Sequence, residues 1–182
     1  MRSINVLTIS GEPENWEGSV RIVEAATNFF PSETWDTVEY VGKISLEHDV
    51  KITAKNESLG AFLFENLVEK IKRIKDSERL MSLLLGLTSD PVVATYYFFD
   101  GEKFKRESFL VHDYVAEKVG IVSLFQLEKD ASNKVVAHGL GHNKGLRHHI
   151  EPIDLMYSEL SKSSILRIDG FCKNCLRKLA KD

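Results

Sequence analysis

The sequence predicts an α/β fold in which helices pack on a largely parallel sheet. The chain has 182 residues, which is the length of one domain with a sizeable core. Its composition, 43% hydrophobic and 28% charged, is that of an ordinary globular protein and excludes collagen-like and disordered chains. Segments of strand character alternate with segments of helical periodicity, which is the pattern of a largely parallel sheet covered by helices.

The elements are predicted in that alternating order. We expect strands at 4–10, 34–42, 80–87, 92–99 and 120–127, and helices at 20–30, from 56 or 58 to 75, from 130 or 132 to about 144, and at 175–180. The run at 80–87 is continuously apolar, as in a strand covered on both faces, whereas the helix ending at Lys75 has one apolar stripe. Asp100-Gly101 predicts a turn, and residues 102–119 fit neither pattern clearly.

Charge and cysteine usage restrict the class of function. The net charge is −3, which argues against a nucleic-acid partner, and no apolar run is long enough to span a bilayer. The N-terminal residues are interpreted as a strand and not as a signal peptide, so we expect a cytoplasmic protein without a membrane partner. The two cysteines, Cys172 and Cys175, form a CxxC pair, which in such a chain indicates metal binding or redox chemistry.

A group of histidines between residues 138 and 148 predicts a metal site. His138 and His142 are four apart, so a helix places both imidazoles on one face, one turn apart. Gly145 permits a positive φ, and the resulting turn brings His148 back as a third ligand. Three protein ligands leave zinc an open position, as in catalytic sites. The alternative is a solvated, imidazole-rich helix end, and His48 and His112 are interpreted as surface residues.

These residues resemble the metzincin zinc peptidases and, more narrowly, the archaemetzincins. The resemblance rests on His138, His142 and His148, on Met156 at the place of the Met-turn, and on the C-terminal CxxC. The resemblance runs from residue 80 to the C-terminus, because it also includes two segments that resemble strands of the family, LLLGLTSD and GIVSLFQL. It implies a zincin-like fold with a mixed twisted sheet, an active-site helix and a small C-terminal lobe tied by zinc, with Met156 as an apolar floor and not a ligand.

Three positions depart from the family. The catalytic Glu is replaced by Gly139, and two cysteines of a second, structural zinc site are replaced by His149 and Asp154. Since histidine and aspartate are also zinc ligands, the resemblance implies a retained site. Its ligands would be His149, Asp154, Cys172 and Cys175, which gives two zinc ions in all. The alternatives are a lost site with a free dithiol, or a redox role for the CxxC.

The resemblance implies a zinc metallopeptidase that hydrolyses peptide bonds through a zinc-bound water. Its activity should be weak or absent, because Gly139 cannot serve as the general base. The alternative is a non-catalytic zinc protein that binds peptides or a protein partner in the same cleft. We expect a single domain, with an N-terminal lobe at 1–145 and a small lobe at 146–182. A peptide would pair with an edge strand, which the resemblance assigns to 120–127.

Overall fold

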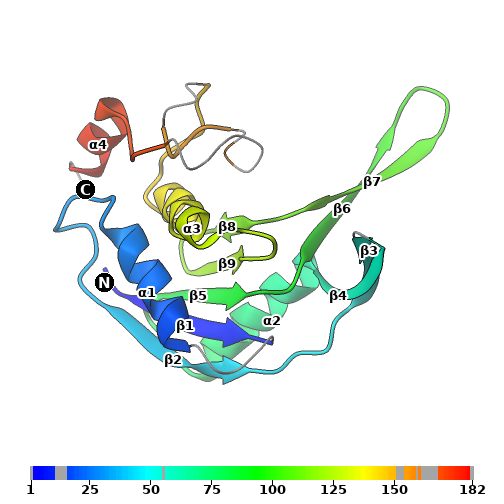
Figure 1. Ribbon diagram of the computed structural model, residues 1–182, viewed down its shortest axis with the longest axis horizontal. Coiled ribbons are helices and arrows are strands. Elements are labelled where there is room, and N and C mark those ends of the chain that lie inside the picture. Colours follow the sequence, from blue (N-terminus) through cyan, green and yellow to red (C-terminus); the bar gives the residue numbers. More distant parts are fainter. Residues whose placement is uncertain are drawn as a thin grey trace.

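The computed structural model describes residues 2–10, 16–54, 56–150, 154–158, 160 and 168–180 (Figure 1). In these residues the strands are β1 (Ile4–Ile9), β2 (Val38–Ile44), β3 (Val50–Ala54), β4 (Glu57–Leu63), β5 (Leu83–Thr88), β6 (Val92–Phe99), β7 (Phe104–Leu110), β8 (Asp113–Val115) and β9 (Val119–Ser123). The helices are α1 (Trp16–Thr27), α2 (Phe64–Ser77), α3 (Lys129–Asn143) and α4 (Lys173–Leu179). The predicted α/β class is confirmed.

The main sheet has the strand order β2-β1-β5-β9-β8. Its first four strands are parallel, and β8 runs antiparallel to β9, so the sheet is mixed as expected. Every residue of β5 is buried, because helices cover both faces of the sheet. A second sheet, in the order β3-β4-β6-β7, extends from the first (Figure 1).

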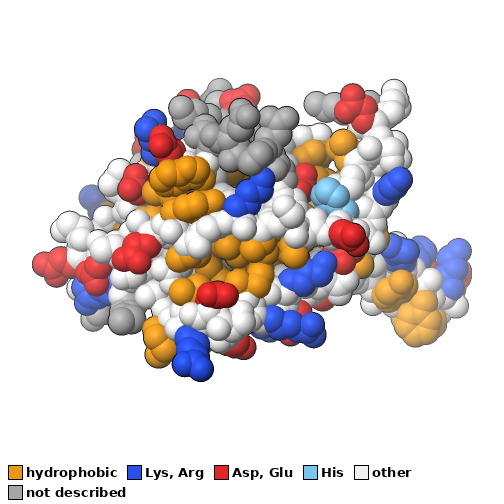
Figure 2. Space-filling model, turned by 90° about the horizontal axis from the view of Figure 1, so that it is seen from below, with side chains coloured by type: hydrophobic (Ala, Val, Ile, Leu, Met, Phe, Trp, Pro, Cys, Tyr) orange, Lys and Arg blue, Asp and Glu red, His pale blue; other side chains and the backbone are white. Residues whose placement is uncertain are grey.

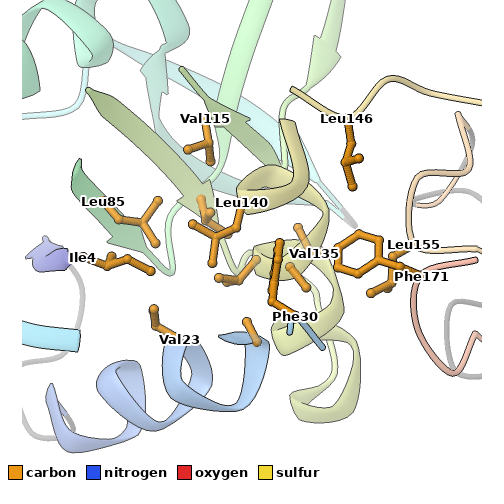
Figure 3. Close-up of a cluster of buried hydrophobic side chains, with 14 of the residues drawn as sticks. Ile4, Val23, Phe30, Leu85, Val115, Val135, Leu140, Leu146, Leu155 and Phe171 are labelled. Atoms are coloured by element: carbon orange, nitrogen blue, oxygen red, sulfur yellow. The ribbon is translucent and has the colours of Figure 1, made fainter. Parts of the chain in front are cut away.

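Two hydrophobic cores lie on opposite faces of the main sheet. Successive side chains of a strand point to opposite faces, so Val6 of β1 joins the core under α1 and α3, whereas Leu7 joins the core under α2. The first core also takes in the C-terminal segment. Figure 3 shows Leu155 and Phe171 against α3, on the side away from the strands. The helix α3 is therefore held between the sheet, α1 and the C-terminal residues.

The helix predicted from residue 56 or 58 is wrong in its first part. The chain forms β4 up to Leu63 and becomes helical only at Phe64. Leu59 and Phe62 fit a helical stripe by spacing, but Leu59 pairs with β3 and Phe62 with β6, so both belong to strand ladders. The prediction failed because strand pairing is a non-local interaction that the local apolar spacing cannot reveal.

Other element boundaries differ by a few residues. Strands β2 and β5 begin later than predicted, at Val38 and Leu83, and α1 begins earlier, at Trp16. The strand expected at 120–127 ends at Ser123, since Leu127 donates its N–H to the Leu124 carbonyl in a turn. Helix α3 begins at Lys129, so Asp130 and Ser132 lie inside the helix and do not cap it.

The hairpin β6–β7 projects from the body of the molecule (Figure 1). Its turn contains Asp100 and Gly101, as predicted, and β7 occupies part of the segment that the sequence left unassigned. Figure 2 shows hydrophobic side chains together with basic ones at its tip. Phe99 and Phe104, both exposed, pack on each other there. Among the helices in the described ranges, none has the length and apolar character needed to cross a membrane.

Candidate metal centre

Helix α3 and the turn after it bring three histidines together. The Nε2 atoms of His138 and His142 are 3.1 Å apart, one helical turn from each other. Gly145 has φ +75°, as the sequence predicts, and ends the helix by donating its N–H to the His142 carbonyl. The chain then returns, so that Nε2 of His148 lies 3.0 Å from that of His138 and 2.9 Å from that of His142.

Backbone carbonyls fix the protonation of two of these imidazoles. Nδ1 of His138 lies 2.5 Å from the Leu155 oxygen, and Nδ1 of His142 lies 3.0 Å from the Leu146 oxygen. A carbonyl only accepts hydrogen bonds, so each Nδ1 carries the proton and each Nε2 keeps its lone pair. Burial lowers the pKa of all three histidines, which favours their neutral forms. The cluster therefore presents lone pairs to one point.

This arrangement fits a zinc ion. Three nitrogens bound tetrahedrally to one zinc ion at about 2.0–2.1 Å lie about 3.3 Å apart. In the structure the three nitrogen–nitrogen separations are 2.9–3.1 Å, which is slightly shorter, and they are nearly equal. Two lone pairs that face each other without a proton between them repel, and a cation at their common focus removes that repulsion.

Met156 packs against α3, the helix that carries His138 and His142. It is fully buried, and its sulfur packs on α3 at Gly141, where a Cβ would come within 2.6 Å of Sδ. The glycine thus permits close contact between the helix and the Met156 segment. The thioether therefore contacts the helix that carries two of the histidines, and its role as an apolar floor stays a prediction.

A second group of donors comprises His149, Asp154, Cys172 and Cys175. Nε2 of His149 lies 3.3 Å from Oδ1 of Asp154, 3.5 Å from Sγ of Cys175 and 3.9 Å from Sγ of Cys172. In a tetrahedral zinc site the corresponding edges are about 3.3 Å for nitrogen to oxygen and about 3.6 Å for nitrogen to sulfur. The four residues of the predicted second site therefore have nearly the spacing that one zinc ion requires.

Backbone bonds hold this second group in place. Asp154 is fully buried, and its carboxylate accepts the N–H groups of Met156 and Cys172. Burial, followed by the negative charge of Asp154, raises the pKa of the Cys175 thiol to about 12. A cation among these donors reverses that effect, because it favours the thiolate and neutralises the buried carboxylate. The chemistry of the donors thus fits zinc.

The three-histidine group opens into a cavity of about 740 Å³. Its walls come from the β6–β7 hairpin, from residues 112–115, from α3 and from the segment after His148. His112, which the sequence analysis assigned to the surface, is half-buried in this wall, whereas His48 pairs with Asp90 elsewhere. The three-histidine group therefore faces a cavity of the size that ligand-binding sites have.

Comparison with solved structures identifies the fold. Archaemetzincin from Methanopyrus kandleri superposes with a TM-score of 0.61 at 19% identity, over 99% of this chain and 94% of that one. A zinc-dependent peptidase from Methanocorpusculum labreanum gives 0.59 at 18%, over 97% and 99%. Archaemetzincin from Archaeoglobus fulgidus, complexed with malonate, gives 0.57 at 15%, over 97% and 99%. The chain has the archaemetzincin fold. No protein-family model and no curated protein matches the sequence.

In this archaemetzincin fold the edge strand of the main sheet that borders the cavity is β8, not the segment 120–127. Strand β9 covers residues 119–123 and is paired on both sides, with β5 and with β8. The short strand β8 is the last in the sheet order and borders the cavity. The prediction was wrong because β8 has three residues, too few to give a recognisable alternation in the sequence.

Asp113 of β8 is a site residue that the sequence analysis missed. It lines the cavity beside Gly139, the position to which the sequence resemblance assigns the catalytic Glu of archaemetzincins. Burial raises the pKa of Asp113 to about 6, and the charges of His142 and His112 oppose that rise only in part. The signal in the sequence that could have pointed to Asp113 was its position as an acidic residue next to His112, in the segment 102–119 that was left unassigned. Its significance depends on the pairing of β8 with β9, which brings it to α3.

Proposed function

We propose that the protein is a zinc metallopeptidase of archaemetzincin type that acts on peptides or unfolded proteins. His138, His142 and His148 hold the catalytic zinc, and His149, Asp154, Cys172 and Cys175 hold a structural zinc. The observation that carries this proposal is the convergence of three imidazole Nε2 atoms, 2.9–3.1 Å apart, at the wall of a 740 Å³ cavity. The archaemetzincin fold supports it.

Each part of the site has a role in binding and orientation. Zinc, when bound, lowers the pKa of water and polarises a substrate carbonyl. The carbonyls of Leu155 and Leu146 keep His138 and His142 in the tautomer that ligates through Nε2. The outer side of β8 offers backbone N–H and C=O groups along the cavity, so an extended peptide can add to the sheet there.

Gly139 has no side chain, so residue 139 cannot supply a general base, and hydrolysis is slow unless another residue takes that role. General-base assistance contributes typically ~10²–10⁴ in rate. The same observation favours a second candidate function, a non-catalytic zinc protein that binds peptides in this cavity. Hydrolysis of unstructured peptides distinguishes the two, because only a peptidase releases new amino termini.

We also propose the lobe division at 1–145 and 146–182, with the second zinc tying the C-terminal part together. Residues 151–153, 159, 161–167 and 181–182 of that lobe lie outside the described residues. Both cysteines are free thiols. Because zinc ligation needs them reduced, the proposal includes a reducing compartment, the cytoplasm.

Metal analysis tests the proposed function. The purified protein should carry two zinc ions, and His142→Ala should carry one, since it lacks a ligand of the three-histidine group. His48→Ala is the matched control, because this histidine pairs with Asp90 outside both groups, and it should keep two. On unstructured peptides the wild type and His48→Ala should show the same slow hydrolysis, and His142→Ala none. Two zinc ions retained by His142→Ala would contradict the proposal.

A further inference from the structure

Side chains of β8 occupy the space beside Gly139 that a glutamate side chain at this position would enter. A Cβ at residue 139 would lie 3.1 Å from Oδ2 of Asp113 and 2.6 Å from Cγ2 of Val115. The carboxylate oxygens of a glutamate lie roughly 3–4 Å from its own Cβ, as two C–C bonds and one C–O bond dictate. An Asp113 oxygen is therefore about as far from the residue 139 backbone as a glutamate carboxylate at that position would be.

The sheet directs Asp113 towards α3. In β8, Asp113 pairs with Val122 and Val115 with Gly120, while Tyr114 lies between them. Alternate residues of a strand share a face, so Asp113 and Val115 both point to Gly139, and Tyr114 points away to pack on Phe64 of α2. This register, and not chance exposure, determines the position of the carboxylate.

The surroundings of the carboxylate suit proton transfer. The carboxylate of Asp113 has no hydrogen-bond or ion-pair partner among the residues that the structure describes, and the ionisable groups that act on it are His142 and His112. It lines the same cavity as the three histidines. An unpartnered carboxylate in a reaction cavity is available to accept a proton, whereas one fixed in a salt bridge is not.

We propose that Asp113 is the catalytic base of this chain, supplying from the edge strand the carboxylate that Gly139 lacks; this rests on the proposed peptidase function. Asp113 takes one proton from a water molecule as the water oxygen attacks the substrate carbonyl carbon. The C–N bond breaks, and the proton passes from Asp113 to the leaving amine nitrogen. The products are a carboxylic acid and an amine, and the carboxylate is regenerated.

The variant Asp113→Asn tests the role of the carboxylate. It keeps the size of the side chain and removes the proton acceptor, so kcat on unstructured peptides should fall by ~10²–10⁴ with little change in KM. Both zinc ions and the melting temperature should be retained. Glu117→Gln is the matched control, because it removes an exposed carboxylate just beyond β8 and should behave as wild type.

Binding of acetohydroxamic acid gives a second readout that needs no turnover. This probe binds zinc as its anion, so its proton goes either to a carboxylate in the site or to the buffer. Titration calorimetry in two buffers of different ionisation enthalpy should show little proton release for wild type and Glu117→Gln. For Asp113→Asn it should show release of about one proton per site.

The outcomes separate this proposal from the proposed function. If the three-histidine group of the wild type binds no zinc, the proposed function fails. If zinc binds, but wild type and Asp113→Asn release the same number of protons and hydrolyse peptides equally, Asp113 is not the base and the proposed function stands. A folded, zinc-loaded Asp113→Ala that loses activity as Asp113→Asn does would support the proposal.

Discussion

At the residue scale, glycines determine how close other elements come to the metal ligands. Gly139 and Gly141 lie on either side of Leu140, between His138 and His142. At Gly139 the open space is taken by β8, and at Gly141 by Met156. Glycine in mid-helix costs about 0.5–1 kcal/mol relative to alanine, so these positions give up helix propensity for close packing around the site.

The variant Gly139→Ala should therefore destabilise the protein, although the same change usually stabilises a helix. The new Cβ meets Cγ2 of Val115 at 2.6 Å, and overpacking of this kind costs about 1–3 kcal/mol. In a Val115→Ala background, which removes that methyl group, Gly139→Ala should be neutral or stabilising. Chemical denaturation of the four proteins in this cycle measures the coupling. If Gly139→Ala alone were as stable as wild type, the close contact between residue 139 and Val115 would be contradicted.

At the element scale, the second donor group connects α4 to the segment after α3. Cys172 precedes the first turn of α4 and Cys175 lies within it, while His149 and Asp154 come from the preceding loop. His149 is itself held by backbone bonds to Met156 and Ser158. A zinc ion at this group, as proposed, would therefore join elements that contain few residues of regular structure.

Replacing both cysteines by serine should remove one zinc ion and lower the melting temperature. A ligand that binds only the folded state at about a thousandfold above its Kd contributes about 4 kcal/mol of stability. The three-histidine group should keep its zinc. Metal analysis and calorimetry check this, with chelator-treated wild type, which lacks both zinc ions, as a reference that should melt at or below the variant. A variant that keeps two zinc ions and the wild-type melting temperature would exclude the second site.

At the scale of the whole molecule, the two groups of metal-ligating side chains lie next to the same hydrophobic core, but their side chains differ in pKa. Leu155, which follows Asp154 of the second group, is buried with residues of α1 and α3 (Figure 3), and Met156 belongs to the same core. Burial lowers the pKa of the three histidines, so above about pH 6.5 they are neutral and no proton competes with zinc there. In the second group, burial raises the pKa of Cys175 to about 12, and zinc must displace its proton.

Zinc affinity should accordingly depend on pH at one site only. Between pH 7 and 8 the Kd of the three-histidine group should stay nearly constant, because its ligands are already deprotonated. The Kd for zinc at the second group should decrease at least about tenfold for each unit of rising pH, because zinc binding there releases the proton of Cys175. Competition with a chromophoric chelator measures both, using His142→Ala and the double serine variant to isolate each site. Equal pH dependence at the two sites would contradict this assignment of protons.

The sequence by itself determined the features that depend on short-range geometry. Four residues are one helical turn, so His138 and His142 could be paired without knowledge of the fold, and Gly145 indicated the turn that returns His148. The alternation of strands and helices was equally readable, as each element carries its own periodicity. The second donor group was recognised through its resemblance to a known family.

Tertiary structure alone decided which elements meet. The pairing of β3 with β4 replaced part of a predicted helix, and the pairing of β8 with β9 made β8 the edge of the sheet. That second pairing brings Asp113 to Gly139, although the two residues belong to different elements far apart in the chain. Such contacts are formed by strand hydrogen bonds and close packing between distant segments, and these leave no periodic trace in the sequence around either residue.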